Sequence, residues 1–200
     1  TGYSPVMSRS AATPRATPAT EADLLAQPPD GARFELIDGE LVEKEASRRH
    51  SHGQAQLAAA LIPPYGRRRG SDGPGGWRIL TEPYVRFGAQ VLRPDLGGWH
   101  RDRLAGTPDE EVIEVRPDWV CEIVSVGHAG NDLVRKRRLY HQHGVPHYWL
   151  LEPRTETLLV LRWTPQGYLE VLAAGRGEVV RAEPFMEVDL AVSSLFWDEE

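Results

Sequence analysis

The sequence predicts an α/β domain with a mixed central β-sheet flanked by helices and an added C-terminal β-hairpin. Residues 119–125 are apolar on both alternating faces, which is typical of a central strand that is covered on two sides. Helical patterns lie before and after this strand, at residues 47–62 and at about residues 131–143. Short β patterns and turn signals separate them, and this order of elements favours a mixed sheet.

The composition fits one domain. The chain has 200 residues and 40% hydrophobic content, which is enough to bury a substantial core. Residues 1–20 are rich in Ser, Ala, Thr and Pro and are predicted to be a flexible leader. We therefore expect one domain over residues 21–200, with its core at about residues 34–153.

Charge and cysteine content narrow the class of protein. A net charge of -6 argues against a protein that coats nucleic acid non-specifically, although a nuclease with an acidic metal site remains compatible. The single cysteine excludes a disulfide framework. We find neither an apolar run of about 18 residues nor a signal peptide, so we predict a soluble cytoplasmic protein without a membrane partner.

Three helices are predicted from their caps and stops. Thr20 caps a short helix that the prolines at 28 and 29 end. The second helix covers residues 47–62, and we expect Pro63 and Pro64 to stop it. The third begins at residue 131 or 132 and ends near residue 143, before a Gly-Val-Pro segment.

Strands are predicted where β-forming residues are bounded by turn signals. Asp38-Gly39 lies between two extended runs and is a strong hairpin signal. The predicted strands cover residues 34–37, 40–44, 77–87 with a break at Pro83, 91–96 ending near Gly97 and Gly98, 119–125, and 147–151. A later hairpin pairs residues 157–163 with residues 168–173, whereas residues 100–115 are predicted to be loop.

Three charged residues are predicted to meet in one site. Glu122 lies mid-strand, where a buried charge is costly unless it is paired, hydrogen-bonded or bound to a metal. Asp95 follows a proline at the end of a short strand, and Lys136 lies on the packed helix face between Leu133 and Tyr140. Two converging carboxylates can hold Mg²⁺, and a lysine can neutralise charge that develops on a phosphoryl group.

Each of these assignments has a structural alternative. The two carboxylates could be a buried ion pair or hydrogen-bonded groups that support the fold, and the lysine could pair with Asp132 along the helix. Glu40, beside the hairpin turn, could approach the site or be a solvated strand residue. His50 could orient a phosphate or a water, or could be a surface or capping residue.

A set of motifs recurs in one known family in the same order and spacing. They are Glu35 to Leu41, His50, Arg93-Pro94-Asp95, Glu122 to Ser125, Asp132, Lys136, Tyr140, Gly144-Val145 and Tyr148-Trp149. These motifs resemble the Uma2 family, also called DUF820, of restriction endonuclease-like proteins. The resemblance runs from about residue 34 to residue 153. It implies the PD-(D/E)XK nuclease fold, a restriction endonuclease-like mixed sheet flanked by helices.

The resemblance also implies residue roles. Asp95 and Glu122 are similar to the two acidic metal ligands of the family. The usual lysine two residues after the second acid is absent, because position 124 is valine. Lys136 resembles a migrated lysine that reaches the site from the helix, with Asp132 as its support. A second departure is Ser125-Val126-Gly127, where the family usually has Ser-Pro-Ser.

We therefore expect a Mg²⁺-dependent (or Mn²⁺-dependent) endonuclease that hydrolyses phosphodiester bonds in DNA. Asp95 and Glu122 would hold the metal, and Lys136 would assist the attacking water. The alternative is a non-catalytic module that keeps the nuclease fold and binds nucleic acid or a protein partner. A homodimer is also expected, through the C-terminal hairpin, because two-fold symmetric enzymes often cut both strands.

Overall fold

A computed structural model describes most of the chain. It covers residues 17–28, 31–44, 47–68, 70, 73–104, 106, 111–125 and 129–197, without the side chains of residues 129–132. Most of the predicted leader, residues 1–16, lies outside these ranges. The N–H of Ala19 donates to the carbonyl of Gly39 at 2.7 Å, so the described end of that segment is attached to the hairpin turn.

Within the described residues, the central sheet is mixed and has six strands in the order β11-β10-β9-β8-β6-β3. β8 and β9 are parallel, and the other neighbours are antiparallel. The strands are β3 (Trp77–Thr81), β6 (Leu96–His100), β8 (Trp119–Ile123), β9 (His147–Glu152), β10 (Thr157–Thr164) and β11 (Gly167–Gly175). This confirms the predicted α/β fold, and the predicted hairpin, β10 with β11, extends the central sheet at one edge.

Two smaller sheets complete the described β-structure. The five-stranded sheet has the order β2-β1-β5-β4-β7, and the third sheet pairs β12 with β13. Their strands are β1 (Arg33–Ile37), β2 (Glu40–Lys44), β4 (Tyr84–Phe87), β5 (Gln90–Leu92), β7 (Val112–Ile113), β12 (Val179–Ala182) and β13 (Phe185–Ala191). The predicted hairpin turn is confirmed, because Asp38 and Gly39 both have positive φ between β1 and β2. The segment predicted as loop at residues 100–115 contains the short strand β7.

The helices are α1 (Glu21–Leu25), α2 (Arg48–Tyr65), α3 (Ala129–Gln142) and the short 3₁₀ helix η1 (Val192–Leu195). Thr20 caps α1 through a capping box with Asp23, as the sequence predicts. None of the helices in the described ranges is both long enough and apolar enough to cross a membrane.

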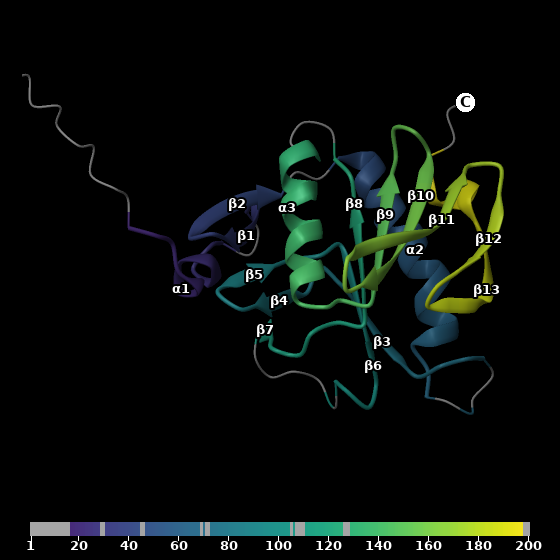
Figure 1. Cartoon of the computed structure of the whole chain (residues 1–200), viewed down its shortest axis with the longest axis horizontal. Helices are drawn as coiled ribbons and strands as arrows, with labels where there is room; N and C mark the ends of the chain where they lie inside the picture. The colour runs from purple at the N-terminus through teal and green to yellow at the C-terminus, as the bar shows by residue number, and fades with distance from the viewer. Residues whose placement is uncertain are drawn as a thin grey trace, which may run out of the picture.

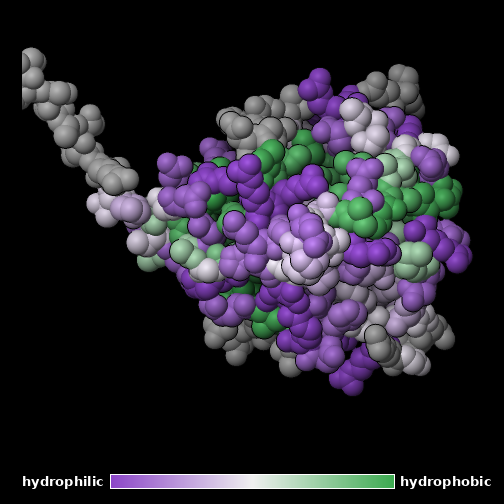
Figure 2. Space-filling view, viewed as in Figure 1, coloured by the Kyte–Doolittle hydropathy of each residue, from purple (hydrophilic) through white to green (hydrophobic). Residues whose placement is uncertain are grey.

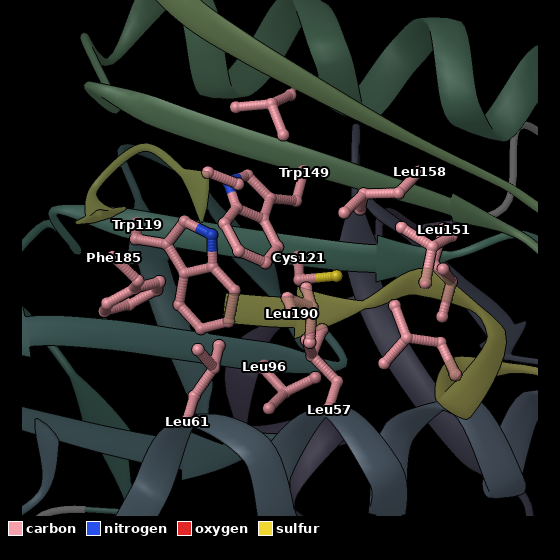
Figure 3. Close-up of a cluster of buried hydrophobic side chains, with 14 of the residues drawn as sticks. Leu57, Leu61, Leu96, Trp119, Cys121, Trp149, Leu151, Leu158, Phe185 and Leu190 are labelled. Atoms are coloured by element: carbon pink, nitrogen blue, oxygen red, sulfur yellow. The ribbon is translucent and has the colours of Figure 1, made fainter. Parts of the chain in front are cut away.

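The two long helices cover opposite faces of the central sheet, with α3 in front of it and α2 behind it in Figure 1. Strand β8 is buried at every position. Its Trp119 and Cys121 pack with Leu57 and Leu61 of α2 (Figure 3). Its Val120 packs instead with Tyr140 of α3 and its neighbours. Alternation along the strand therefore places the side chain of Glu122 on the α3 side.

The sequence prediction was wrong about Gly97 and Gly98. They do not end a strand over residues 91–96; they lie inside β6, and residues 93–95 separate β5 from β6. A Cβ on Gly98 would lie 3.0 Å from Cε3 of Trp119. Glycine is favoured there because the indole of the neighbouring strand lies close to the space that a side chain would take.

The prediction that two prolines stop the second helix was also wrong. Pro63 and Pro64 lie within α2, which ends at Tyr65. The ring of Tyr65 is buried against Phe185, and its hydroxyl donates to Oε2 of Glu187 at 2.7 Å. Tertiary packing of this last turn therefore outweighs the local cost of proline.

Candidate metal and phosphodiester site

The three charged residues predicted to form a site do meet at one end of β8. Leu96 of β6 pairs with Cys121 of β8 in an antiparallel register, so the residue before Leu96 lies beside the residue after Cys121. These two residues are Asp95 and Glu122, and both are buried. Lys136 of α3 reaches the same point, with its Nζ 3.2 Å from Oε2 of Glu122.

Glu122 is held by two side chains of α3. Lys136 and Tyr140 are four residues apart and therefore lie on one face of the helix, one above the other. The hydroxyl of Tyr140 donates to Oε1 of Glu122 at 2.5 Å, while the Lys136 ammonium contacts Oε2. Arg135 points away from this face, and its guanidinium contacts Asp38 at the hairpin turn.

Asp95 has partners from three other elements. Its Oδ2 accepts the backbone N–H of Ile123 at 2.6 Å. Its Oδ1 lies 2.7 Å from Nζ of Lys44, the last residue of β2. Its Oδ1 is also 3.0 Å from Nε2 of His50, in the first turn of α2. His50 is thus buried beside Asp95 rather than at the surface, and within the described part of the chain its buried Nδ1 has no hydrogen-bond partner.

Two residues of the site were not assigned from the sequence. Glu35 of β1 is fully buried; its Oε1 accepts the N–H of Arg93 at 2.6 Å and its Oε2 lies 2.7 Å from Nζ of Lys136. Lys44 is the second. The register of the β1–β2 hairpin pairs Glu35 with Val42, so Glu35, Val42 and Lys44 share one face of the hairpin. The same face carries the buried Ile37. The alternation that places Glu35 and Lys44 on this face is the sequence signal that could have identified both residues.

The structure does not bring every predicted residue into the cluster. Glu40 is exposed at the turn end of the hairpin, on the same face as Glu35 but beyond the buried part. The side chain of Asp132 lies outside the described residues, as does the altered loop at residues 126–128. The roles predicted for Asp132 and this loop therefore stay predictions.

The electrostatics of the two acids differ. Burial raises the pKa of Glu122 to about 7, because Lys136 and Lys44 only partly offset the cost of removing the charge from water. Burial acts on Asp95 in the same direction, but the Lys44 ammonium and His50 outweigh it and lower the pKa of Asp95 below its usual value. Asp95 is therefore ionised throughout the neutral range, whereas Glu122 exchanges its proton within that range.

The two acids fit a hard divalent cation. Oδ1 of Asp95 and Oε2 of Glu122 lie 2.7 and 3.9 Å from the same ammonium, so one small cation can stand between them. Among the described residues, no group of three or more His, Cys, Asp or Glu side chains is arranged as a metal cage. Mg²⁺ does not need such a cage, because it commonly binds one or two carboxylates and keeps several waters.

Comparisons with known proteins identify the family and support the fold. Residues 21–193 match the family described as "Uma2: Putative restriction endonuclease". The fold is similar to the crystal structure of "a putative nuclease belonging to DUF820" from Anabaena variabilis ATCC 29413. That match has a TM-score of 0.72 and 21% sequence identity, and it covers 89% of this chain and 97% of the other. No curated protein matches the sequence.

Proposed function

The chain belongs to the Uma2 family, and from this premise we propose that it is a metal-dependent endonuclease that hydrolyses phosphodiester bonds in DNA. One observation carries the proposal: three buried carboxylates share two ammonium groups, one on the buried Lys136 and one on Lys44, whose side chain is 9% exposed. With the carboxylates ionised, the three acids exceed the two ammonium groups by one negative charge. A divalent cation would compensate this excess, and buried charge is stable only when it is compensated.

The proposed ligands are Asp95 and Glu122, with Mg²⁺ or Mn²⁺ as the metal. A bound metal would act as a Lewis acid and would lower the pKa of a bound water. The protein fixes the ligands beforehand. The N–H of Ile123 orients Asp95, and the hydroxyl of Tyr140 orients Glu122. A site whose groups are held in place costs little reorganisation during the reaction.

Lys136 is proposed as the lysine of the site. Position 124, where the usual PD-(D/E)XK pattern has lysine, is a valine whose N–H donates to the carbonyl of Leu151. Lys136 comes from α3 instead and is aimed by Glu35 at 2.7 Å and Glu122 at 3.2 Å. Its role would be to position the attacking water and to neutralise charge that develops on the phosphoryl oxygens.

A cleavage assay tests the proposal. Supercoiled plasmid is incubated with Mg²⁺ and with wild type, Asp95→Asn, Glu122→Gln or Lys136→Met. We expect each variant to lose at least a hundredfold in cleavage rate while its circular dichroism spectrum is unchanged. Glu40→Gln is the matched control, because Glu40 is an exposed acid on the hairpin that also carries Glu35 and Lys44. Equal cleavage by wild type and Glu122→Gln would contradict the proposal.

A second candidate function is a non-catalytic module that binds nucleic acid or a protein partner. One observation favours it: the described lysines already compensate most of the acidic charge without a metal. Calorimetric titration with Mn²⁺ separates the two. A wild-type protein that binds no Mn²⁺ but still retains DNA would favour the binding module.

We also propose that the chain is a cytoplasmic homodimer. The predicted surface is the β10–β11 hairpin, because β11 is an edge strand of the central sheet and its Leu169 is 53% exposed. Figure 2 shows that hydrophilic residues cover much of the molecular face on which α3 lies, which makes that face less suitable as a dimer interface. Light scattering after gel filtration would give the mass, and a Leu169→Lys variant should shift it to that of a monomer.

A further inference from the structure

Lysine is rare in this chain. It has two lysines, Lys44 and Lys136, and all the remaining residues counted as Lys or Arg are arginines. Lys136 is buried and Lys44 is nearly so, and both contact the carboxylate cluster. Lysine carries a compact ammonium on a flexible four-carbon stem, whereas arginine carries a wide planar fork. The site is therefore the place where this chain uses compact ammonium groups instead of guanidinium groups.

The two lysines have different positions relative to the proposed metal ligands. Nζ of Lys136 contacts Glu35 and Glu122, so it touches one proposed ligand and one residue outside the pair. Nζ of Lys44 lies 2.7 Å from Asp95 and 3.9 Å from Glu122, so it stands between both ligands. The carbonyl of Arg93 also accepts from it at 2.5 Å. Three oxygen atoms around one cation are the surroundings that a hard metal ion would use.

We propose that the Lys44 ammonium occupies the cation position between Asp95 and Glu122 when no metal is bound, and that a divalent metal must displace it. This inference rests on the proposed function. An ammonium and a divalent ion within about 4 Å of each other repel strongly in a buried site. The two cannot share the same oxygen atoms, so metal binding moves the ammonium away.

The displacement has a consequence for metal affinity. In the metal-free protein the Lys44 ammonium compensates the charge of the two acids. The binding free energy of the metal is therefore only the difference between the attraction of the acids for the metal and their attraction for the ammonium. The side chain of Lys44 is 9% exposed and that of Lys136 is 4% exposed. The Lys44 stem can carry its ammonium outward, whereas Lys136 stays between Glu35 and Glu122.

A labelling experiment on the wild-type protein tests the movement. The amines are acetylated with sulfo-N-hydroxysuccinimide acetate, with and without saturating Mn²⁺, and peptides are quantified by mass spectrometry. We expect Mn²⁺ to increase acetylation of Lys44 at least fivefold and to leave Lys136 unchanged. Because these are the chain's two lysines, Lys136 is an internal control. An unchanged or lower acetylation of Lys44 in the metal-bound protein would overturn the inference.

A pair of variants tests the competition. Lys44→Met and Lys136→Met each remove one buried positive charge from the same cluster, so a difference between them reports position rather than charge. In Mn²⁺ calorimetry at pH 8 we expect Lys44→Met to bind at least tenfold more tightly than wild type, and Lys136→Met to change less. Equal or weaker binding by Lys44→Met, with Mn²⁺ still bound by wild type, refutes the inference alone. An absence of Mn²⁺ binding in all three proteins refutes the proposed function.

Discussion

Replacing Glu122 with glutamine should make the protein more stable at alkaline pH. Burial raises the pKa of Glu122 from its usual 4.5 to about 7, so the folded state holds this proton more tightly than the unfolded state. The stability that follows is present below pH 4.5 and is lost as the pH rises through 7. A glutamine side chain at this position would have no proton to lose and could still accept from the hydroxyl of Tyr140.

The expected size follows from the two pKa values. Each unit of difference is worth about 1.4 kcal/mol. Because both states titrate partly at pH 5 and at pH 8, the change in wild-type stability between these values is on the order of 2 to 3 kcal/mol. A chain of this length shifts its melting temperature by about 2–4 °C per kcal/mol. The gap between Glu122→Gln and wild type should therefore widen by about 5 to 10 °C from pH 5 to pH 8.

Thermal melts of both proteins in EDTA at several pH values provide the test. EDTA removes divalent ions, so a bound metal does not obscure the titration. Comparing each variant with wild type cancels the contribution of the histidines. Glu170→Gln, at an exposed position of β11, is the control and should run parallel to wild type. Parallel curves for Glu122→Gln and wild type would refute the assignment of Glu122 as a buried, destabilising charge.

Three further predictions concern the surroundings of this carboxylate. Tyr140→Phe removes the hydroxyl that donates to Oε1 of Glu122 and should destabilise the protein by about 1–3 kcal/mol in urea unfolding; no change would mean that this hydrogen bond is replaced by water. Asp95→Asn should lose less stability than wild type as the pH falls below 4. The lowered pKa of Asp95 gives the wild-type protein stability that is present above pH 3.8 and is lost as the pH falls. Coinciding acid titrations of the two proteins would contradict this. Gly98→Ala should cost about 1–3 kcal/mol, because the new methyl group would lie 3.0 Å from the Trp119 ring, and unchanged urea midpoints would show that the ring can shift.

The sequence was most informative where a local signal and a tertiary role coincide. The hairpin at Asp38-Gly39, the capped helix at Thr20 and the buried strand around Glu122 were all predicted and are confirmed. Asp95 and Lys136 were expected beside Glu122, and the antiparallel register and the helix face bring them there. The hairpin turn, the helix cap and the buried strand depend on spacing along single elements, which the sequence contains, whereas the placement of Asp95 also needs the pairing of β6 with β8.

The remaining features depend on contacts between distant segments. Glu35 and Lys44 enter the site because the hairpin lies against α3 and β6. The alternation within the hairpin places both residues on one face but does not show which elements that face contacts. Gly98 is typical of a strand end until the indole of Trp119 is placed beside it. The prolines of α2 predict a stop until Tyr65 is seen packed on Phe185. In each case a partner far along the chain decides the outcome.

The central claim is that Asp95 and Glu122 bind one divalent cation, and Mn²⁺ calorimetry at pH 8 tests it most directly. Wild type should bind one Mn²⁺ per chain, and Asp95→Asn should weaken this binding at least tenfold. Its circular dichroism spectrum should match that of wild type. Wild-type protein that shows no heat of Mn²⁺ binding, or Asp95→Asn that binds Mn²⁺ as tightly as wild type, would contradict the claim.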